Sequence, residues 1–140
     1  MKIRVMINYI SGERLFPYGS EIPSPVKIAV NVNLLSAELK GESNAEIPFV
    51  FVVNYIPSVA QITIKGHVIV SGSDKEINEI IKAQKEKKPP PRSIMQSVLT
   101  TGTAEAVIIS RSIGVPPPVA TPAIPSQLGN VKVKNRGYTI

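Results

Sequence analysis

The chain contains no cysteine and no tryptophan, only one histidine, and aromatic residues make up just 5% of its 140 residues. Without cysteine it forms neither disulfides nor thiolate metal sites, which is consistent with a reducing compartment. With so few aromatic residues, the core must be built mainly from β-branched residues, which favour strands. A chain of this length is expected to form one domain with a substantial core.

Groups that could perform chemistry are equally scarce. The ten carboxylates show no metal-ligand spacing, and Glu76 and Glu79 fit more simply near a helix N-terminus. The single histidine, His67, lies within a predicted strand, where we expect it to face solvent or to bond locally. A hydroxyl nucleophile needs a base to activate it, and the Ser-Gly-Ser of residues 71–73 lacks the Lys-Ser/Thr of a phosphate-binding loop. We therefore expect no enzyme, no cofactor and no metal site.

The sequence also lacks long apolar runs. No stretch approaches the roughly 18 uncharged apolar residues that span a membrane. The charged, alternating start of the chain has no uninterrupted apolar core of the kind found in signal peptides. We expect a cytoplasmic protein without a membrane span.

What is present in abundance is alternation of apolar and polar residues, which predicts four strands. These are expected at Ile3–Tyr9, Val26–Val32, Ile47–Tyr55 and Ile62–Val70. The third is apolar on both faces, which is typical of a central strand covered on both sides, by helices or by another subunit. Gly66 in the fourth indicates a bulge or a close backbone approach.

Two helices are predicted after the strands. Ser73 with Glu76 three residues later forms a capping box, and the helix that follows should end in lysines just before three consecutive prolines. The second helix is predicted at Arg92–Arg111, where Gly102 indicates either close packing or a break. Gly114 fits a helix C-cap.

The remainder of the chain is rich in proline and then in basic residues. Five prolines between positions 116 and 125 predict an extended path. We assign residues 1–125 to a single α+β domain, with a four-stranded antiparallel sheet and two C-terminal helices packed on one face. Residues 126–140 are expected to form a basic, mobile C-terminal tail.

The net charge of +6 is concentrated in two clusters. The first comprises Lys82, Lys85, Lys87, Lys88 and Arg92, and the second Lys132, Lys134 and Arg136. Each cluster is explained either as a solvated helix end or tail, or as a site for a polyanion. Single-strand nucleic-acid binders interleave basic groups with aromatic platforms, whereas here the aromatic residues lie mostly away from the lysines.

Apolar surface offers another kind of binding. An edge strand, a proline-rich loop carrying Phe16 and Tyr18, and a helix rich in Ile, Met and Val can border a groove for an extended peptide. Met95 is adaptable enough to suit varied contacts. The other explanation is that these residues belong to the core or to a subunit interface.

The order of these segments resembles the SecB family of export chaperones. The resemblance rests on VKIAVNV at 26–32, FVFVVNY at 49–55, QITIKGHVIVSG at 61–72, RSIMQSVLTTG at 92–102 and VPPP at 115–118. It implies an ATP-independent holdase that is a tetramer, built as a dimer of dimers, and that binds unfolded polypeptides in apolar grooves. By position, the groove candidates are Phe16, Tyr18, Ile22, Ile94, Met95 and Val98.

The charge departs from that family. Its members are typically acidic and meet the translocation motor through an acidic surface, whereas this chain is basic, so client holding transfers more readily than motor docking. The sequence thus predicts a SecB-like holdase chaperone. The alternatives are a basic nucleic-acid-binding module and a structural oligomer without a client.

Overall fold

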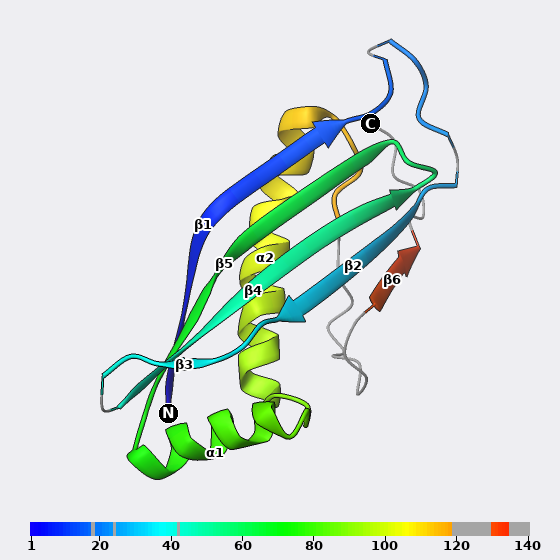
Figure 1. The fold of residues 1–140 in the computed structure, drawn as a ribbon. Helices are drawn as coiled ribbons and strands as arrows, with labels where there is room; N and C mark the ends of the chain where they lie inside the picture. Colours follow the sequence, from blue (N-terminus) through cyan, green and yellow to red (C-terminus); the bar gives the residue numbers. More distant parts are fainter. Residues whose placement is uncertain (18, 24, 42, 119–129, 135–140) are drawn as a thin grey trace.

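The computed structural model describes residues 1–17, 19–23, 25–41, 43–118 and 130–134, and it has an α+β architecture (Figure 1). Its strands are β1 (Lys2–Arg14), β2 (Lys27–Leu34), β3 (Glu38–Leu39), β4 (Asn44–Ile56), β5 (Ala60–Ser71) and β6 (Asn130–Lys134). Its helices are α1 (Asp74–Lys85) and α2 (Arg92–Ile113). All strand pairings are antiparallel, in the order β1-β5-β4-β2-β6, and β3 pairs with β4.

The observed sheet therefore has more strands than the four predicted. The four expected strands are present, but β3 and β6 extend the sheet, and because β6 follows α2 the helices are not the last elements of the chain. β6 lies within the expected tail and pairs with the edge of β2 (Figure 1). Its short basic pattern carries little signal of its own, so this pairing decides its conformation. The rest of the expected mobile tail, residues 126–129 and 135–140, lies outside the described residues.

β1 is longer than its alternation predicts, because a bulge interrupts it. The register with β5 shifts between Ile7 and Tyr9. Ile7 lies opposite Gly66, whereas beyond the bulge Ile10 lies opposite Ile64. One extra residue reverses the facing of all residues that follow, so the strict period of two ends at Tyr9 although the strand continues.

The core lies between the sheet and α2, which crosses one face of the sheet (Figure 1). Phe49, Phe51 and Tyr55 of β4 are almost completely buried on this face. A Cβ at Gly102 would lie 2.5 Å from Cδ2 of Phe51, so α2 passes directly over this ring. Of the two predictions for Gly102, close packing is confirmed, and α2 runs through it without a break.

Gly66 is the other close approach. A Cβ there would lie 2.1 Å from the carbonyl oxygen of Met6 and 2.9 Å from the ring of Phe49. The predicted close approach is confirmed, and the bulge lies opposite, in β1.

α1 lies across the end of the sheet where β4 begins and buries Ile77 and Ile80 in the same core (Figure 1). The predicted capping box is confirmed: the backbone N–H of Glu76 donates to Oγ of Ser73, and that of Ser73 donates to the Glu76 carboxylate, at 3.2 Å each. These bonds to Ser73 lower the pKa of Glu76. The cap fixes where the chain leaves the sheet and enters the helix.

The end of α2 is fixed by Gly114, which has a left-handed conformation as predicted for a C-cap. Nη1 of Arg14, at the end of β1, donates to the carbonyl oxygens of Ile113 and Gly114 at 3.0 Å each. The chain then passes under β4, where the hydroxyl of Tyr55 donates to the carbonyl oxygen of Pro116 at 2.5 Å. Burial raises the pKa of Tyr55 well above its usual range.

Candidate functional site

The groove residues predicted from the sequence do not form a single site. Ile94 and Val98 are fully buried in the core beneath α2, where a bound chain does not reach them. Phe16 and Ile22 are partly buried at the edge of the core, and Tyr18 lies outside the described residues. Of the described candidates, Met95 lines the cavity presented next.

The described groove candidates in the loop after β1 lie far from Met95. Phe16 packs on the guanidinium of Arg14, 3.8 Å from the ring centroid, and Arg14 bonds the last carbonyls of α2. Met95 lies in the first turn of the same helix. At about 1.5 Å per residue, the 18 positions from 95 to 113 span roughly 27 Å. The loop after β1 and the start of α2 therefore belong to opposite ends of the molecule.

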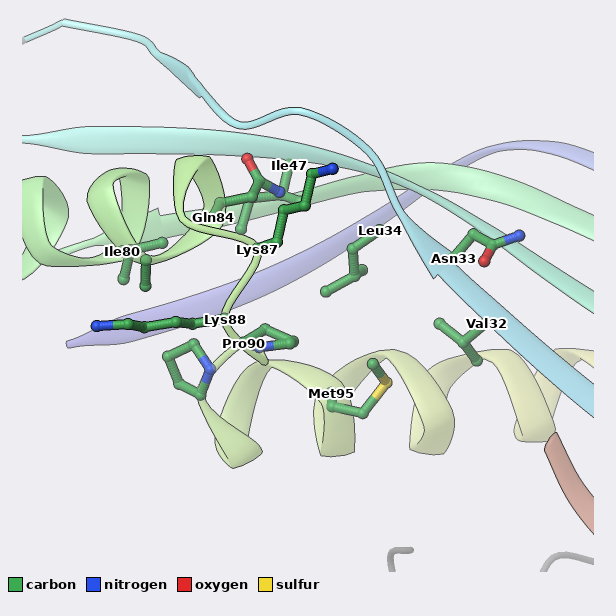
Figure 2. A pocket seen from close by; sticks show the side chains of 12 residues that line it. Val32, Asn33, Leu34, Ile47, Ile80, Gln84, Lys87, Lys88, Pro90 and Met95 are labelled. Carbon is green, nitrogen blue, oxygen red and sulfur yellow. The ribbon is translucent and has the colours of Figure 1, made fainter. Parts of the chain in front are cut away.

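The cavity at Met95, here called the junction pocket, lies where α1, α2 and the end of β2 meet (Figure 2). Its volume is about 320 Å³. The apolar lining includes Val32, Leu34, Ile47, Ile80, Pro90 and Met95. The polar lining is Asn33, Gln84, Lys87 and Lys88. Figure 2 shows Leu34 of β2 and Met95 of α2 pointing toward one another, while Lys87 and Lys88 extend in different directions.

Gln84 closes one wall of the junction pocket. Its side-chain amide nitrogen donates to the carbonyl oxygen of Leu35 at 2.5 Å, and its amide oxygen accepts from the backbone N–H of Ala37. One side chain thus satisfies two backbone groups between β2 and β3, and it ties α1 to the sheet. Because both bonds involve a segment that is not regular structure, they give the pocket a defined shape.

A second feature is the outer edge of the sheet. Among the described strands only β5 pairs with β1, so the other edge of this 13-residue strand is unpaired. Met6, Tyr9 and Ile10 are large apolar residues exposed along it. Unpaired edges of this length invite another strand to pair with them. We call β1 with these three side chains the edge surface.

The sheet face opposite α2 is covered by none of the described elements. Pro48, Val50 and Val52 of β4 are only partly buried there, so the expected cover on both faces of this strand is absent within the described chain. His67 also lies on this face.

The environment of His67 matches the expectation of local bonding. Its Nδ1 lies 2.9 Å from a carboxylate oxygen of Glu46 but is not aligned for a hydrogen bond, and its Nε2 lies 3.4 Å from the amide nitrogen of Asn8. Glu46 is in turn 3.8 Å from the ammonium group of Lys40. These contacts join three strands, β1, β5 and β4, and the turn after β3 across the open face.

The described residues contain no group of three or more histidine and carboxylate side chains placed to hold a metal ion. Within that same part of the chain, neither helix has the length and apolar character needed to cross a bilayer.

Sequence reasoning missed the junction pocket as a site, although it named Met95 and the lysine cluster separately. The signal that could have joined them is the break between the helices: the lysines end α1 and Met95 begins α2, so a short connection must bring them together. Of the second basic cluster, Lys132 and Lys134 belong to β6, and Arg136 lies outside the described residues.

Comparisons with known proteins add no relative. No protein-family model matches the chain, no curated protein matches its sequence, and no solved structure matches its fold.

Proposed function

We propose that this protein is an ATP-independent holdase chaperone of the SecB-like kind, which binds unfolded polypeptides as extended segments. The observation that carries the proposal is the edge surface: a 13-residue strand with one unpaired edge and three exposed apolar side chains, Met6, Tyr9 and Ile10. An extended client segment can add to such an edge as a further strand. Its main chain then supplies hydrogen bonds regardless of sequence, and its side chains meet the apolar residues.

Two further features support client binding. The structure has an antiparallel sheet and two helices, which is the α+β class that the resemblance to SecB implies, although β3 and β6 enlarge the sheet beyond the four strands expected. Ile108 on the outer side of α2 is exposed, which adds apolar surface beside β1, since the neighbouring Ile109 lies against Gly12 of that strand. An extended client segment at this edge therefore meets apolar side chains of both β1 and α2.

The test is suppression of aggregation. A chemically denatured client enzyme is diluted into buffer without ATP, and light scattering is followed with increasing amounts of this protein. We expect scattering to fall to near baseline at stoichiometric concentration. Unchanged light scattering at that concentration would refute the proposal.

A matched pair of variants locates the binding surface. The double variant Met6→Lys, Ile10→Lys places two charges on the edge surface, where each native side chain is 48% exposed. The control, Leu35→Lys with Leu39→Lys, makes the same change at side chains that are 50% and 55% exposed but lie away from β1. We expect the first to lose most suppression, because charges on an edge block strand addition, and the second to retain it.

Assembly is part of the same proposal, with a tetramer as the expected state. The open face at Val50 and Val52 is the surface that a second subunit would cover. Native mass measurement checks this. A tetramer that fails to suppress aggregation would instead support a structural oligomer without a client.

The nucleic-acid alternative is favoured by one observation, the lysines that end α1 and begin the connection to α2. Binding of single-stranded oligonucleotide that weakens steeply with salt would support it, because phosphate contacts release counterions.

A further inference from the structure

The junction pocket combines an apolar interior with charge of one sign. Its lining residues include two lysines, Lys87 and Lys88, and no aspartate or glutamate. Lys88 is exposed and its ammonium group lies 2.9 Å from the carboxylate of Glu86, whereas the described residues offer Lys87 no ion pair. The electrostatic potential at the rim is therefore positive, and only the charge of Lys88 is partly neutralised, by Glu86.

The backbone at Lys87 supplies an independent observation. Its φ is +58°, the sole positive value at a non-glycine residue in the described chain. The N–H of Lys87 donates to the Gln84 carbonyl oxygen, and that of Lys88 to Ala83. These two bonds form the Schellman motif, in which the residue after the C-cap is left-handed and is usually glycine.

The C-terminal end of α2 provides a comparison within the same chain. This helix also ends on a left-handed residue, with φ of +69°, and that residue is Gly114. At the equivalent place α1 carries a lysine, which has a Cβ that disfavours this conformation. The negative end of the α1 dipole already faces Lys82 and Lys85 in the last turn, so the dipole does not require Lys87. Because glycine would relieve this backbone strain, its retention at Lys87 indicates a function for the lysine side chain.

We propose that the junction pocket binds a straight-chain carboxylate of the fatty-acid type. The alkyl chain lies against Leu34, Ile47 and Met95, and the carboxylate accepts a hydrogen bond from Lys87, with Lys88 adding positive charge. The volume of about 320 Å³ is at the small end for ligand sites, and a partner helix, about 10 Å across, does not fit. A neutral or cationic amphiphile would leave Lys87 without a counterion. The proposal does not depend on client holding.

Titration calorimetry with octanoate, decanoate and dodecanoate, each below its micellar concentration, tests the apolar part. We expect affinity to rise by about fourfold per methylene, the factor that corresponds to burying one such group, until the pocket is full. Decanol and decyltrimethylammonium test the charge, and both should bind at least about threefold more weakly than decanoate.

Variants test the assignment to this pocket. Lys87→Gln should weaken decanoate binding by about 3- to 10-fold, a range set by exposed and charge-assisted contacts. Lys85→Gln is the matched control, since it removes another exposed charge from the same helix end at a residue outside the lining. Ala83→Leu enlarges a partly buried lining residue and should abolish binding by filling the cavity.

The three methionines provide a readout at the residue itself. With methyl-labelled methionine, decanoate should shift the resonance of Met95, while exposed Met6 on β1 and Met1 serve as internal controls. A shift confined to Met95 that is lost in Ala83→Leu supports the proposal. It is overturned if decanoate shifts all three resonances alike, if none moves at saturating decanoate, or if Lys87→Gln and Lys85→Gln have equal effects on affinity.

Discussion

Replacement of Gly102 by alanine tests the packing of α2 on the sheet. In an exposed helix the change would stabilise by about 1 kcal/mol, because alanine has the higher helix propensity. Here the new Cβ would lie 2.5, 2.7 and 2.8 Å from Cδ2, Cε2 and Cγ of Phe51. That ring is fully buried, so it has no open space into which to move.

The magnitude follows from these opposing effects. Inserting a methyl group into a well-packed core costs about 1–3 kcal/mol. Contacts with several atoms of a rigid ring place Gly102→Ala in the upper half of that range. After the gain in helix propensity is subtracted, we expect a net loss of about 1–2 kcal/mol in the free energy of unfolding.

Equilibrium unfolding in urea measures this difference. Thr100→Ala, at an exposed position of the same helix, is the control and should stabilise by about 0.5 kcal/mol. In a Phe51→Leu background the smaller side chain leaves room for the methyl group, so Gly102→Ala should there be neutral or stabilising. The double-mutant cycle of these two substitutions should therefore give a coupling energy of at least about 1–2 kcal/mol. If Gly102→Ala proves as stable as the parent, the assignment of close packing is wrong.

Two further predictions concern single side chains. Tyr55→Phe should destabilise by about 1–2 kcal/mol at pH 7, because the buried carbonyl oxygen of Pro116 loses its donor. Since burial raises the pKa of Tyr55 in the folded state, the parent keeps this stability below the unfolded pKa of about 10 and loses it as pH rises further, so the difference from Tyr55→Phe should shrink by pH 11 in urea unfolding. Lys87→Gly should raise the unfolding free energy by about 0.5–1 kcal/mol, because glycine tolerates the left-handed conformation. A melting temperature below that of the parent would contradict this reading of the strain.

The regular elements follow closely from local pattern. Alternation located β2, β4 and β5, and the pair Ser73 and Glu76 located the start of α1. These signals are reliable because each depends on residues that are near in sequence: strand facing has a period of two, and a cap is satisfied within one turn.

The prediction fell short where distant segments decide the outcome. The bulge in β1 is placed opposite Gly66 of β5, and β6 is a strand through its pairing with β2. Neither is marked by its own residues. The helix candidates were chosen for apolar character, which does not distinguish a residue that faces the core, such as Val98, from one that lines a cavity, such as Met95.

The sequence by itself determined the α+β class and the helix caps at Ser73 and Gly114, and it marked Gly66 and Gly102 as unusual positions, because propensity, capping and backbone freedom are properties of short segments. That both glycines are close approaches was decided by the packing around them. Only the tertiary structure decided which surfaces remain for binding. Whether an apolar side chain is covered depends on what packs over it, and that partner comes from another part of the chain. The unpaired edge of β1 and the lysines around the junction pocket therefore become visible only after the sheet and the helices are assembled.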